Sequence, residues 1–209
     1  MATLEDDPRI DPRIKEIMGM MPPLALGDVV DREQLLREAN HPKALKRASE
    51  MEAMFELVDT EEIAPSAGLR IATHEFISQP DGNAVKVQFI RPDTAEVLPC
   101  VYYIHGGGMQ AMSCFYGIYR AWGKFIAREG VAVAMVDFRN CVTPSSAPEV
   151  APFPAGLNDC VSGVKWLAGQ AEALAIDAGR IVVAGESGGG NLTLATGLKL
   201  KRDGDIALI

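Results

Sequence analysis

The spacing of hydrophobic residues changes once along this chain, near position 60. Before that point apolar residues recur at helical spacing, first at Ile14, Ile17, Met18 and Met21. Asp11 is placed to cap this helix and Pro22-Pro23 to end it. Asp31 and Gln34 resemble a capping box for a second helix, and a third helix is expected to begin at Pro42.

Beyond about residue 68, short apolar runs predict strands that alternate with helical segments. The stretches 69–78 and 85–91 flank a turn sequence at 80–83 and predict a β-hairpin. Further strands are expected at 98–104, 131–137 and 181–184, and helices at about 117–129, 157–169 and 190–202. This order indicates an α/β fold with a mainly parallel, doubly wound sheet. Residues 206–209 look like the opening of one more strand.

Several side chains in this second part have structural interpretations. Four large apolar residues are predicted to pack on the sheet from helices: Trp122, Phe125, Trp166 and Leu167. Asp137 and Arg139 are predicted to form an internal ion pair that fixes the loop after their strand. Asp159 is expected to lie near the positive end of a helix.

The sequence around Ser187 carries the strongest chemical signal. An apolar run, Ile181 to Ala184, leads into Gly185-Glu186-Ser187-Gly188-Gly189, which fits the pattern G-x-S-x-G, and a helical segment follows. A strand, a sharp glycine-flanked turn and a helix are the context of a nucleophile elbow, in which a strained turn exposes the serine hydroxyl. Ser187 is therefore the candidate nucleophile, and Glu186 is expected to anchor the elbow by hydrogen bonds.

A second glycine-rich turn, His105-Gly106-Gly107-Gly108, follows the apolar run Cys100 to Ile104. Its backbone N–H groups have no side chains to block them, so they can bind the oxyanion of a tetrahedral intermediate. A lone run of glycines is usually only a turn. Here two motifs follow two separate strands, and both are expected at the carboxyl ends of strands, where sheets of this kind bind ligands.

With these motifs the chain resembles the hormone-sensitive-lipase-like group of α/β-hydrolase esterases, bacterial family IV. Besides the two glycine motifs, the matching stretches are Val136-Asp137-Phe138-Arg139, Ala147-Pro148-Glu149, Pro152-Phe153-Pro154-Ala155 and, for the N-terminal helix, Asp11-Pro12-Arg13-Ile14. The chain departs from the group's pattern in four places. Phe138 replaces a tyrosine, residues 140–146 lengthen a link, Gly188 stands where alanine is common, and Met109 where an aromatic residue is frequent.

The resemblance implies an α/β-hydrolase fold with an N-terminal helical cap over residues 1–60 and a catalytic domain over residues 61–209. It places the oxyanion donors at the amides of Gly107, Gly108 and Gly188. It also implies that His105, Gly106 and Glu186 support the glycine loop. Four residues after this loop have the character of a flexible apolar wall for the substrate, with plain core packing as the alternative: Met109, Met112, Phe115 and Tyr116.

The same resemblance indicates which catalytic groups the sequence lacks. In this fold the triad order is Ser, then Asp or Glu, then His. The three histidines of the chain all precede Ser187; they are His41, His74 and His105. Asp203 and Asp205 follow Ser187 too closely to be the family's acid. We therefore expect the acid and the base to lie outside this sequence, and the catalytic domain to be incomplete at its C-terminus.

Composition narrows the classes of partner. The hydrophobic content of 48% can supply a core, and the net charge of −8 argues against nucleic acid or an anionic membrane as the main partner. Residues 1–7 lack the basic and apolar regions of a secretory signal, and no apolar run approaches membrane-spanning length. The four cysteines show neither C-x-x-C nor metal-ligand spacing. A cytoplasmic location with no metal or organic cofactor is expected, and a homodimer is left open.

These features predict a carboxylic-ester hydrolase for short to medium acyl esters, in which Ser187 forms an acyl-enzyme. A histidine and a carboxylate from a missing C-terminal portion are needed, so the 209-residue chain alone is expected to be inactive. Two alternatives remain open. One is a catalytically inactive small-molecule receptor of the same fold, and the other is a fragment that works only with its complementary half. The sequence after Ile209 distinguishes these hypotheses.

Overall fold

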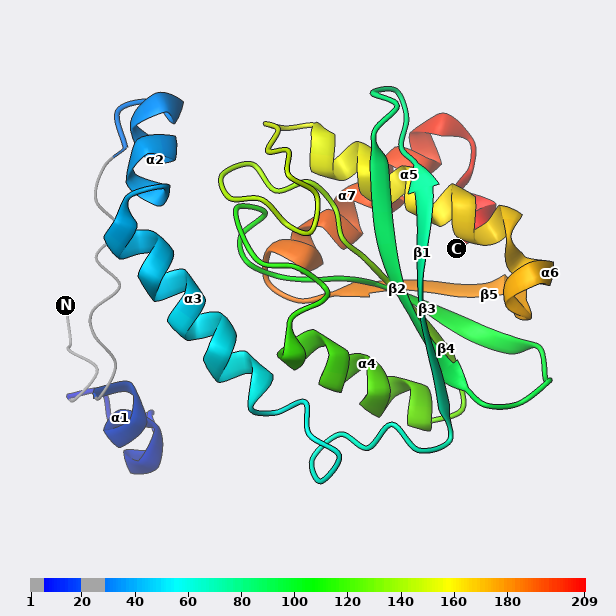
Figure 1. Ribbon diagram of the computed structural model, residues 1–209, viewed down its shortest axis with the longest axis horizontal. Helices are drawn as coiled ribbons and strands as arrows, with labels where there is room; N and C mark the ends of the chain where they lie inside the picture. The colour runs from blue at the N-terminus through cyan, green and yellow to red at the C-terminus, as the bar shows by residue number, and fades with distance from the viewer. Residues whose placement is uncertain (1–5, 20–28) are drawn as a thin grey trace. The chain divides into compact units, whose positions relative to one another are not determined.

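The computed structural model describes residues 6–19 and 29–209, and the chain divides into two compact units (Figure 1). The first unit, Met1–Gln34, contains helix α1 (Pro12–Gly19) and the start of α2 (Arg32–Ala39). The second unit, Leu35–Ile209, contains all the other elements. The proposed boundary at residue 60 between cap and catalytic domain stays a prediction.

The first two helices begin where capping chemistry predicts. The Asp11 carboxylate accepts a hydrogen bond of 2.8 Å from the Arg13 amide, and the Asp31 carboxylate accepts one of 2.8 Å from the Gln34 amide. Each bond satisfies an N–H group that has no partner inside its helix. The predicted end of the first helix, Met21 to Pro23, lies outside the described residues.

The second unit is built on a five-stranded sheet in the order β1-β2-β4-β3-β5. The strands are β1 (Leu69–Ile77), β2 (Ala84–Pro92), β3 (Leu98–Ile104), β4 (Ala132–Val136) and β5 (Ile176–Gly185). Strand β2 is antiparallel to both of its neighbours, whereas β3 pairs in parallel with β4 and β5. Four of the five strands therefore run in one direction, and the predicted mainly parallel sheet is confirmed.

Helices cover both faces of this sheet (Figure 1). They are α4 (Gly117–Arg128), α5 (Ala155–Gly169), the short α6 (Ala171–Leu174) and α7 (Gly188–Asp203), whereas α3 (Pro42–Glu56) packs against α4. Alternate residues of β3 belong to different cores: Tyr102 and Ile104 pack with α5 and α7, and Tyr103 packs with α4. This alternation follows from the two-residue period of a strand and confirms the doubly wound arrangement.

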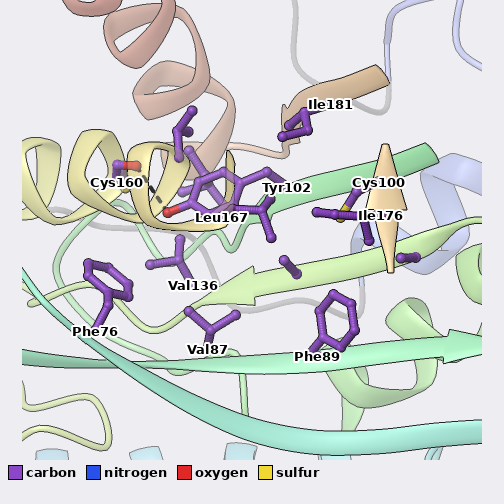
Figure 2. Packing of buried hydrophobic residues seen from close by; sticks show 14 of the residues in the cluster. Phe76, Val87, Phe89, Cys100, Tyr102, Val136, Cys160, Leu167, Ile176 and Ile181 are labelled. Atoms are coloured by element: carbon purple, nitrogen blue, oxygen red, sulfur yellow. Dashed lines mark hydrogen bonds between the residues drawn. The ribbon is translucent and has the colours of Figure 1, made fainter. Parts of the chain in front are cut away.

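The larger core lies between the sheet and the helices α5 and α7 (Figure 2). Tyr102 is fully buried at its centre, and its hydroxyl group donates a hydrogen bond of 3.0 Å to the carbonyl oxygen of Cys160. Leu167 is fully buried, and the Trp166 ring stacks on Phe76 with 5.7 Å between centroids. The predicted packing of these two α5 residues is thus confirmed.

On α4 the corresponding prediction is wrong, because Trp122 and Phe125 keep 47% and 40% of their surface exposed. The buried residues of this helix include the small residues Gly123 and Ala127. A Cβ atom added to Gly123 would lie only 2.8 Å from both Ile90 Cδ1 and Met135 Sδ. Since the helix approaches the strands this closely at Gly123, Trp122 and Phe125 stay on the outward face, whereas Tyr119 of the same helix is buried in the smaller core.

The predicted ion pair between Asp137 and Arg139 is also wrong. The Arg139 guanidinium binds Asp159 of α5 with two contacts of 2.9 Å, and it binds Asp81 of the β1–β2 turn at 2.8 Å. The bonds to Asp159 raise the pKa of Arg139. Because β4 ends at Val136, strand geometry no longer holds residues 137 and 139 on one face, and the two side chains diverge. Asp159 is a buried ion-pair partner rather than a helix-end charge.

The predicted strand at residues 206–209 is a short 3₁₀ helix, η1 (Ile206–Leu208). The Leu208 amide donates to the Asp205 carbonyl oxygen at 3.1 Å, and the Asp205 carboxylate pairs with Lys165 of α5 at 2.6 Å. The first of these bonds uses backbone groups that a strand would offer to a neighbouring strand. Among the described residues, no helix is long and apolar enough to cross a membrane.

Candidate active site

The pairing of β3 with β5 brings the two glycine motifs together. Ile104 lies opposite Gly185 in the parallel register. The residues that follow each strand, His105-Gly106 and Glu186-Ser187, therefore leave the sheet side by side. This position is the carboxyl edge of the parallel strands, as the sequence predicts.

Ser187 occupies a strained turn between β5 and α7. Its backbone has φ 52° and ψ −121°, and the residue is exposed. A side-chain-bearing residue rarely adopts positive φ, so this conformation has to be held by its surroundings. A Cβ atom on Gly185 would lie 2.6 Å from the carbonyl oxygens of Ile104 and Gly189, so the turn is tight on both sides of the serine.

The glycine loop lies against the start of α7. Gly107 and Gly108 have φ values of 90° and 65°, which favour glycine at both positions. A Cβ atom on Gly188 would lie 2.8 Å from the amide nitrogens of Gly108 and Met109. The departure from alanine at position 188 therefore has a physical reason, since only glycine allows the two backbones this close approach. The three candidate oxyanion donors belong to these two touching segments.

Glu186 joins the elbow to the glycine loop. Its Oε1 atom accepts hydrogen bonds of 2.8 Å from the Gly106 amide and from the Tyr119 hydroxyl, and its Oε2 atom accepts one of 2.8 Å from the Tyr103 hydroxyl. Burial, together with the bonds to Glu186, raises the pKa of both tyrosines. Both hydroxyls therefore stay protonated as donors, and the contacts of Glu186 are those expected of an anchor.

The buried side chain of His105 contacts the same loop. The ring is fully buried, stacks on Phe138 with 4.4 Å between centroids, and places Nδ1 3.0 Å from the Gly106 carbonyl oxygen. Burial lowers the pKa of His105, although the charge of Asp137 opposes this effect. A neutral ring with its proton on Nδ1 donates to Gly106. The supporting role that the resemblance implies for His105 stays a prediction.

Asp137 is a supporting residue whose role the sequence did not reveal. Its carboxylate accepts hydrogen bonds from the Ser113 hydroxyl at 2.6 Å, the Cys114 amide at 3.1 Å and the Ser146 amide at 2.7 Å. The His105 Nε2 atom lies 3.9 Å from the same carboxylate. Asp137 thus ties together the segments that follow β3 and β4.

The lengthened link at residues 140–146 also holds the glycine loop. The Cys141 amide donates to the Met109 carbonyl oxygen at 2.9 Å, and the Thr143 amide donates to that of Gln110 at 2.8 Å. In the sequence this link was visible only as a departure from the family pattern. In the structure its backbone amides bind the carbonyl oxygens of the two residues that follow Gly108.

Of the four candidate pocket residues, Met109 lines a cavity of about 320 Å³ beside Gly108. The other three, Met112, Phe115 and Tyr116, pack partly buried against the smaller core near Tyr103 and Tyr119. Their placement favours the packing alternative. Within the ranges that the structure describes, no cluster of three or more His, Cys, Asp or Glu residues could hold a metal ion.

The family of the chain follows from this fold and site. A family model described as alpha/beta hydrolase fold matches residues 101–209, and the chain belongs to that family. Within it, the chain belongs to the hormone-sensitive-lipase-like group. A structure of brefeldin A esterase, described as a bacterial homologue of human hormone-sensitive lipase, is 30% identical with a TM-score of 0.79, over 98% of this chain and 56% of that one.

Two further relatives are named for ester hydrolysis. The structure of esterase Est22 is 60% identical with a TM-score of 0.92, over 99% of this chain and 61% of that one. Ethyl acetate hydrolase of Pseudomonas putida is 36% identical over 129 residues, which are 59% of this chain and 38% of that protein. The chain therefore spans between 38% and 61% of the length of the three relatives.

Proposed function

We propose that this chain carries the nucleophile and the oxyanion hole of a carboxylic-ester hydrolase. The observation that carries the proposal is the position of Ser187, exposed in a turn at φ 52°, next to a Gly188 backbone that touches Gly108. A serine elbow beside a loop of free backbone amides is what acyl transfer requires. The names of the esterase relatives support the same class.

In the proposed reaction the Ser187 Oγ atom attacks the carbonyl carbon of the ester, and its proton passes to a general base. The amides of Gly107, Gly108 and Gly188 donate hydrogen bonds to the oxyanion that forms. When the tetrahedral intermediate collapses, the bond to the alcohol oxygen breaks, the alcohol leaves with the proton, and an acyl-enzyme remains. Water then attacks the acyl-enzyme, releases the carboxylic acid and returns the proton to Ser187.

The base and its orienting carboxylate are proposed to come from a polypeptide segment beyond Ile209. None of the residues after Ser187 in this sequence is a histidine, and His105 is fully buried and bonded to Gly106. We further propose that residues 1–60 act as a cap that limits the size of the ester. The reaction as proposed uses no metal or organic cofactor.

A chimera tests these roles. We would join residues 1–209 to the part of Est22 that follows the position matching Ile209, because the two proteins are 60% identical over 99% of this chain. The 209-residue chain should show no appreciable hydrolysis of p-nitrophenyl butyrate, whereas the chimera should turn it over. Ser187→Ala should abolish this turnover, and Thr73→Ala, which changes an exposed residue of β1, should leave it unchanged.

The same chimera tests the oxyanion loop. A Cβ atom on Gly108 would meet only Gln110 Nε2, at 4.0 Å, so Gly108→Ala perturbs the backbone without a steric clash. Loss of an oxyanion donor lowers kcat by on the order of 10²–10³-fold. A kcat within about threefold of the parent, with a lower denaturant midpoint, would show that the loop is only structural. Turnover by the 209-residue chain that Ser187→Ala removes would overturn the missing-base proposal.

A further inference from the structure

The end of α3 and the start of α4 are joined by a hydrogen bond between distant parts of the chain. Helix α4 begins after Tyr116, whose side chain makes no capping hydrogen bond, and its first turn holds no acidic residue. The Oε1 atom of Glu56, 61 residues earlier, accepts a hydrogen bond of 2.7 Å from the Gly117 amide. This amide is one of the N–H groups that have no partner inside their own helix. Glu56 therefore caps α4, although it belongs to α3.

The position of this carboxylate is unfavourable for its own helix. Glu56 is the last residue of α3, where the helix dipole carries partial negative charge, and the last turn of α3 holds no basic residue. At the start of α4 the dipole is positive, so the same carboxylate stabilises that helix. Its charge therefore favours the contact between the two helices and not α3 alone.

The same contact requires glycine at position 117. A Cβ atom on Gly117 would lie 2.7 Å from both the Glu56 Cα atom and the Phe55 carbonyl oxygen. Any side chain at this position would push the end of α3 away from the start of α4. The backbones of the two helices thus meet directly beside the capping hydrogen bond.

Two basic residues of α4 bind the end of α3 and the segment that follows it. Arg120 pairs with Glu56 and donates a hydrogen bond to the Phe115 carbonyl oxygen. Its Nε atom lies 2.6 Å from Asp59 Oδ2, and the Lys124 ammonium lies 2.8 Å from the other oxygen of that carboxylate. Burial acts to raise the pKa of Asp59, but the hydrogen bonds from Lys124 and Arg120 lower it below the ordinary value, so the carboxylate is charged. The Asp59 and Lys124 side chains keep only 8% and 6% of their surface exposed, so water screens their pairing little.

The first turn of α4 also binds the glycine loop. Tyr119 belongs to this turn, and its hydroxyl group donates a hydrogen bond of 2.8 Å to Glu186 and accepts one of 3.1 Å from the Gly106 amide. A helical turn moves as a unit because its backbone groups are bonded to one another. A displacement of the start of α4 therefore moves the Tyr119 hydroxyl relative to the loop that carries Gly107 and Gly108.

We propose that Glu56 is a positioning residue for the oxyanion hole and acts through the first turn of α4. The proposal rests on the proposed function, because it takes the amides of Gly107 and Gly108 as donors to the substrate. In this role Glu56 makes no contact with the substrate, and it fixes the helix whose Tyr119 hydroxyl binds the loop. Since Glu56 belongs to the proposed cap, a movement of α3 changes the geometry of the oxyanion hole as well as the entry of the ester.

Three substitutions separate the contributions to this contact. Glu56→Ala removes both the cap on Gly117 and the pair with Arg120. Glu56→Gln keeps an oxygen that can accept the hydrogen bond from Gly117 but removes the charge. Gly117→Ala leaves the carboxylate in place and pushes the two helix ends apart.

Asp177 provides the matched control. Its carboxylate likewise accepts a hydrogen bond from a glycine amide, that of Gly179 at 2.9 Å, and pairs with an arginine, Arg180 at 2.6 Å. It lies at the start of β5, at the opposite end of this strand from Gly185. Asp177→Ala therefore removes the same kinds of bond without touching α4 or the glycine loop.

Amide hydrogen exchange of the 209-residue chain, followed by NMR, measures the coupling without turnover. Loss of a helix cap weakens the start of a helix about fivefold, the equivalent of about 1 kcal/mol. Glu56→Ala should therefore speed exchange about fivefold at Gly117 and, through the shared turn, at Gly106. Glu56→Gln should speed it about twofold, because a neutral acceptor keeps roughly half the strength of a charged one. Gly117→Ala should speed exchange at Gly106, and Asp177→Ala should leave it unchanged.

The chimera with Est22 supplies the second readout. Glu56→Ala should lower kcat for p-nitrophenyl butyrate about tenfold, less than the on the order of 10²–10³-fold that is lost with an oxyanion donor itself. KM should stay within about twofold, because the donors act on the transition state. Glu56→Gln should recover most of kcat, and Asp177→Ala should leave both parameters unchanged.

Unchanged exchange at Gly106 in Glu56→Ala would overturn the proposal, and so would a kcat within about twofold of an active parent chimera. Either result would leave the roles of Ser187 and the glycine loop standing. If Glu56→Ala fails to fold, Gly117→Ala decides by the same two measurements. If the parent chimera hydrolyses no ester, the proposed function fails, and the exchange rates still decide whether Glu56 positions the loop.

Discussion

The two faces of the sheet differ in how completely they are covered. Under α5 and α7 the core is continuous, and residues such as Tyr102 and Leu167 are fully buried. Under α4 the core is smaller, and Trp122 and Phe125 remain 47% and 40% exposed around a cavity of about 460 Å³. The wall of this second cavity includes Glu186, the anchor of the glycine loop.

The two faces of the sheet therefore contribute differently: one mainly stabilises the fold, and the other mainly positions the glycine loop. The continuous core fixes the strands, and the Arg139–Asp159 pair closes its end near the site. The less completely covered α4 face contains Tyr103 and Tyr119, whose hydroxyl groups donate hydrogen bonds to Glu186. We infer that substitutions on the α5–α7 face act mainly on folding, and that substitutions on the α4 face act mainly on the loop.

The largest expected effect is at the buried end of the α5–α7 face. Asp159→Ala removes the fully buried carboxylate that binds Arg139. The buried Arg139 then keeps Asp81 as a partner but loses both contacts to Asp159, and breaking a buried pair costs about 3–5 kcal/mol. Urea unfolding of the 209-residue chain measures this loss. Asp203→Ala, which removes an exposed carboxylate paired with Lys199, is the control and should cost clearly less than Asp159→Ala. Equal losses in the two variants would contradict the interpretation.

The next effect compares the two faces directly. Leu167→Ala empties space in the continuous core and should cost about 2–5 kcal/mol. Trp122→Ala removes a larger side chain that is 47% exposed, so it should cost clearly less than Leu167→Ala. Both losses are obtained from the denaturant midpoints of unfolding, with the same dependence of the free energy of unfolding on denaturant concentration for each variant. If the tryptophan variant loses as much as the leucine variant, the α4 face contributes to folding as strongly as the α5–α7 face.

The smallest effect concerns His105, which stacks on Phe138 at 4.4 Å and lies 5.5 Å from the Tyr119 ring. Burial lowers its folded-state pKa below the ordinary value of about 6.5. As the pH falls, His105 therefore becomes protonated in the unfolded chain at a higher pH than in the folded chain. The stabilising contribution is complete above about pH 6.5 and is lost as the pH falls below it, by up to about 1.4 kcal/mol at pH 5.5.

This dependence can be isolated by difference. We would measure the free energy of unfolding between pH 5.5 and 7.5 for the parent chain and for His105→Gln. The parent should lose stability more steeply than the variant as the pH falls. Parallel curves would mean that His105 does not contribute to the pH dependence.

The elements and the two motifs were predictable from the sequence because they depend on local patterns. The residues of β3 and β5 show the alternating or clustered apolar pattern of buried strands. Once these two strands pair, the glycine motifs at their ends lie next to each other. The partners of Arg139 were not predictable, because Asp159 and Asp81 lie 20 and 58 residues away. The outward position of Trp122 likewise depends on how closely Gly123 approaches the sheet, which is a property of packing.

The pairing of Ile104 with Gly185 also determines where this protein tolerates changes in length. One residue inserted into or deleted from β3 or the last part of β5 would move Ser187 roughly 3.3 Å along the sheet relative to Gly107 and Gly108. It would also turn the following side chains to the opposite face. Insertions in the 140–146 link change no strand register. Evolutionary variation in length is therefore expected in the links, while the lengths of these two strand ends stay fixed.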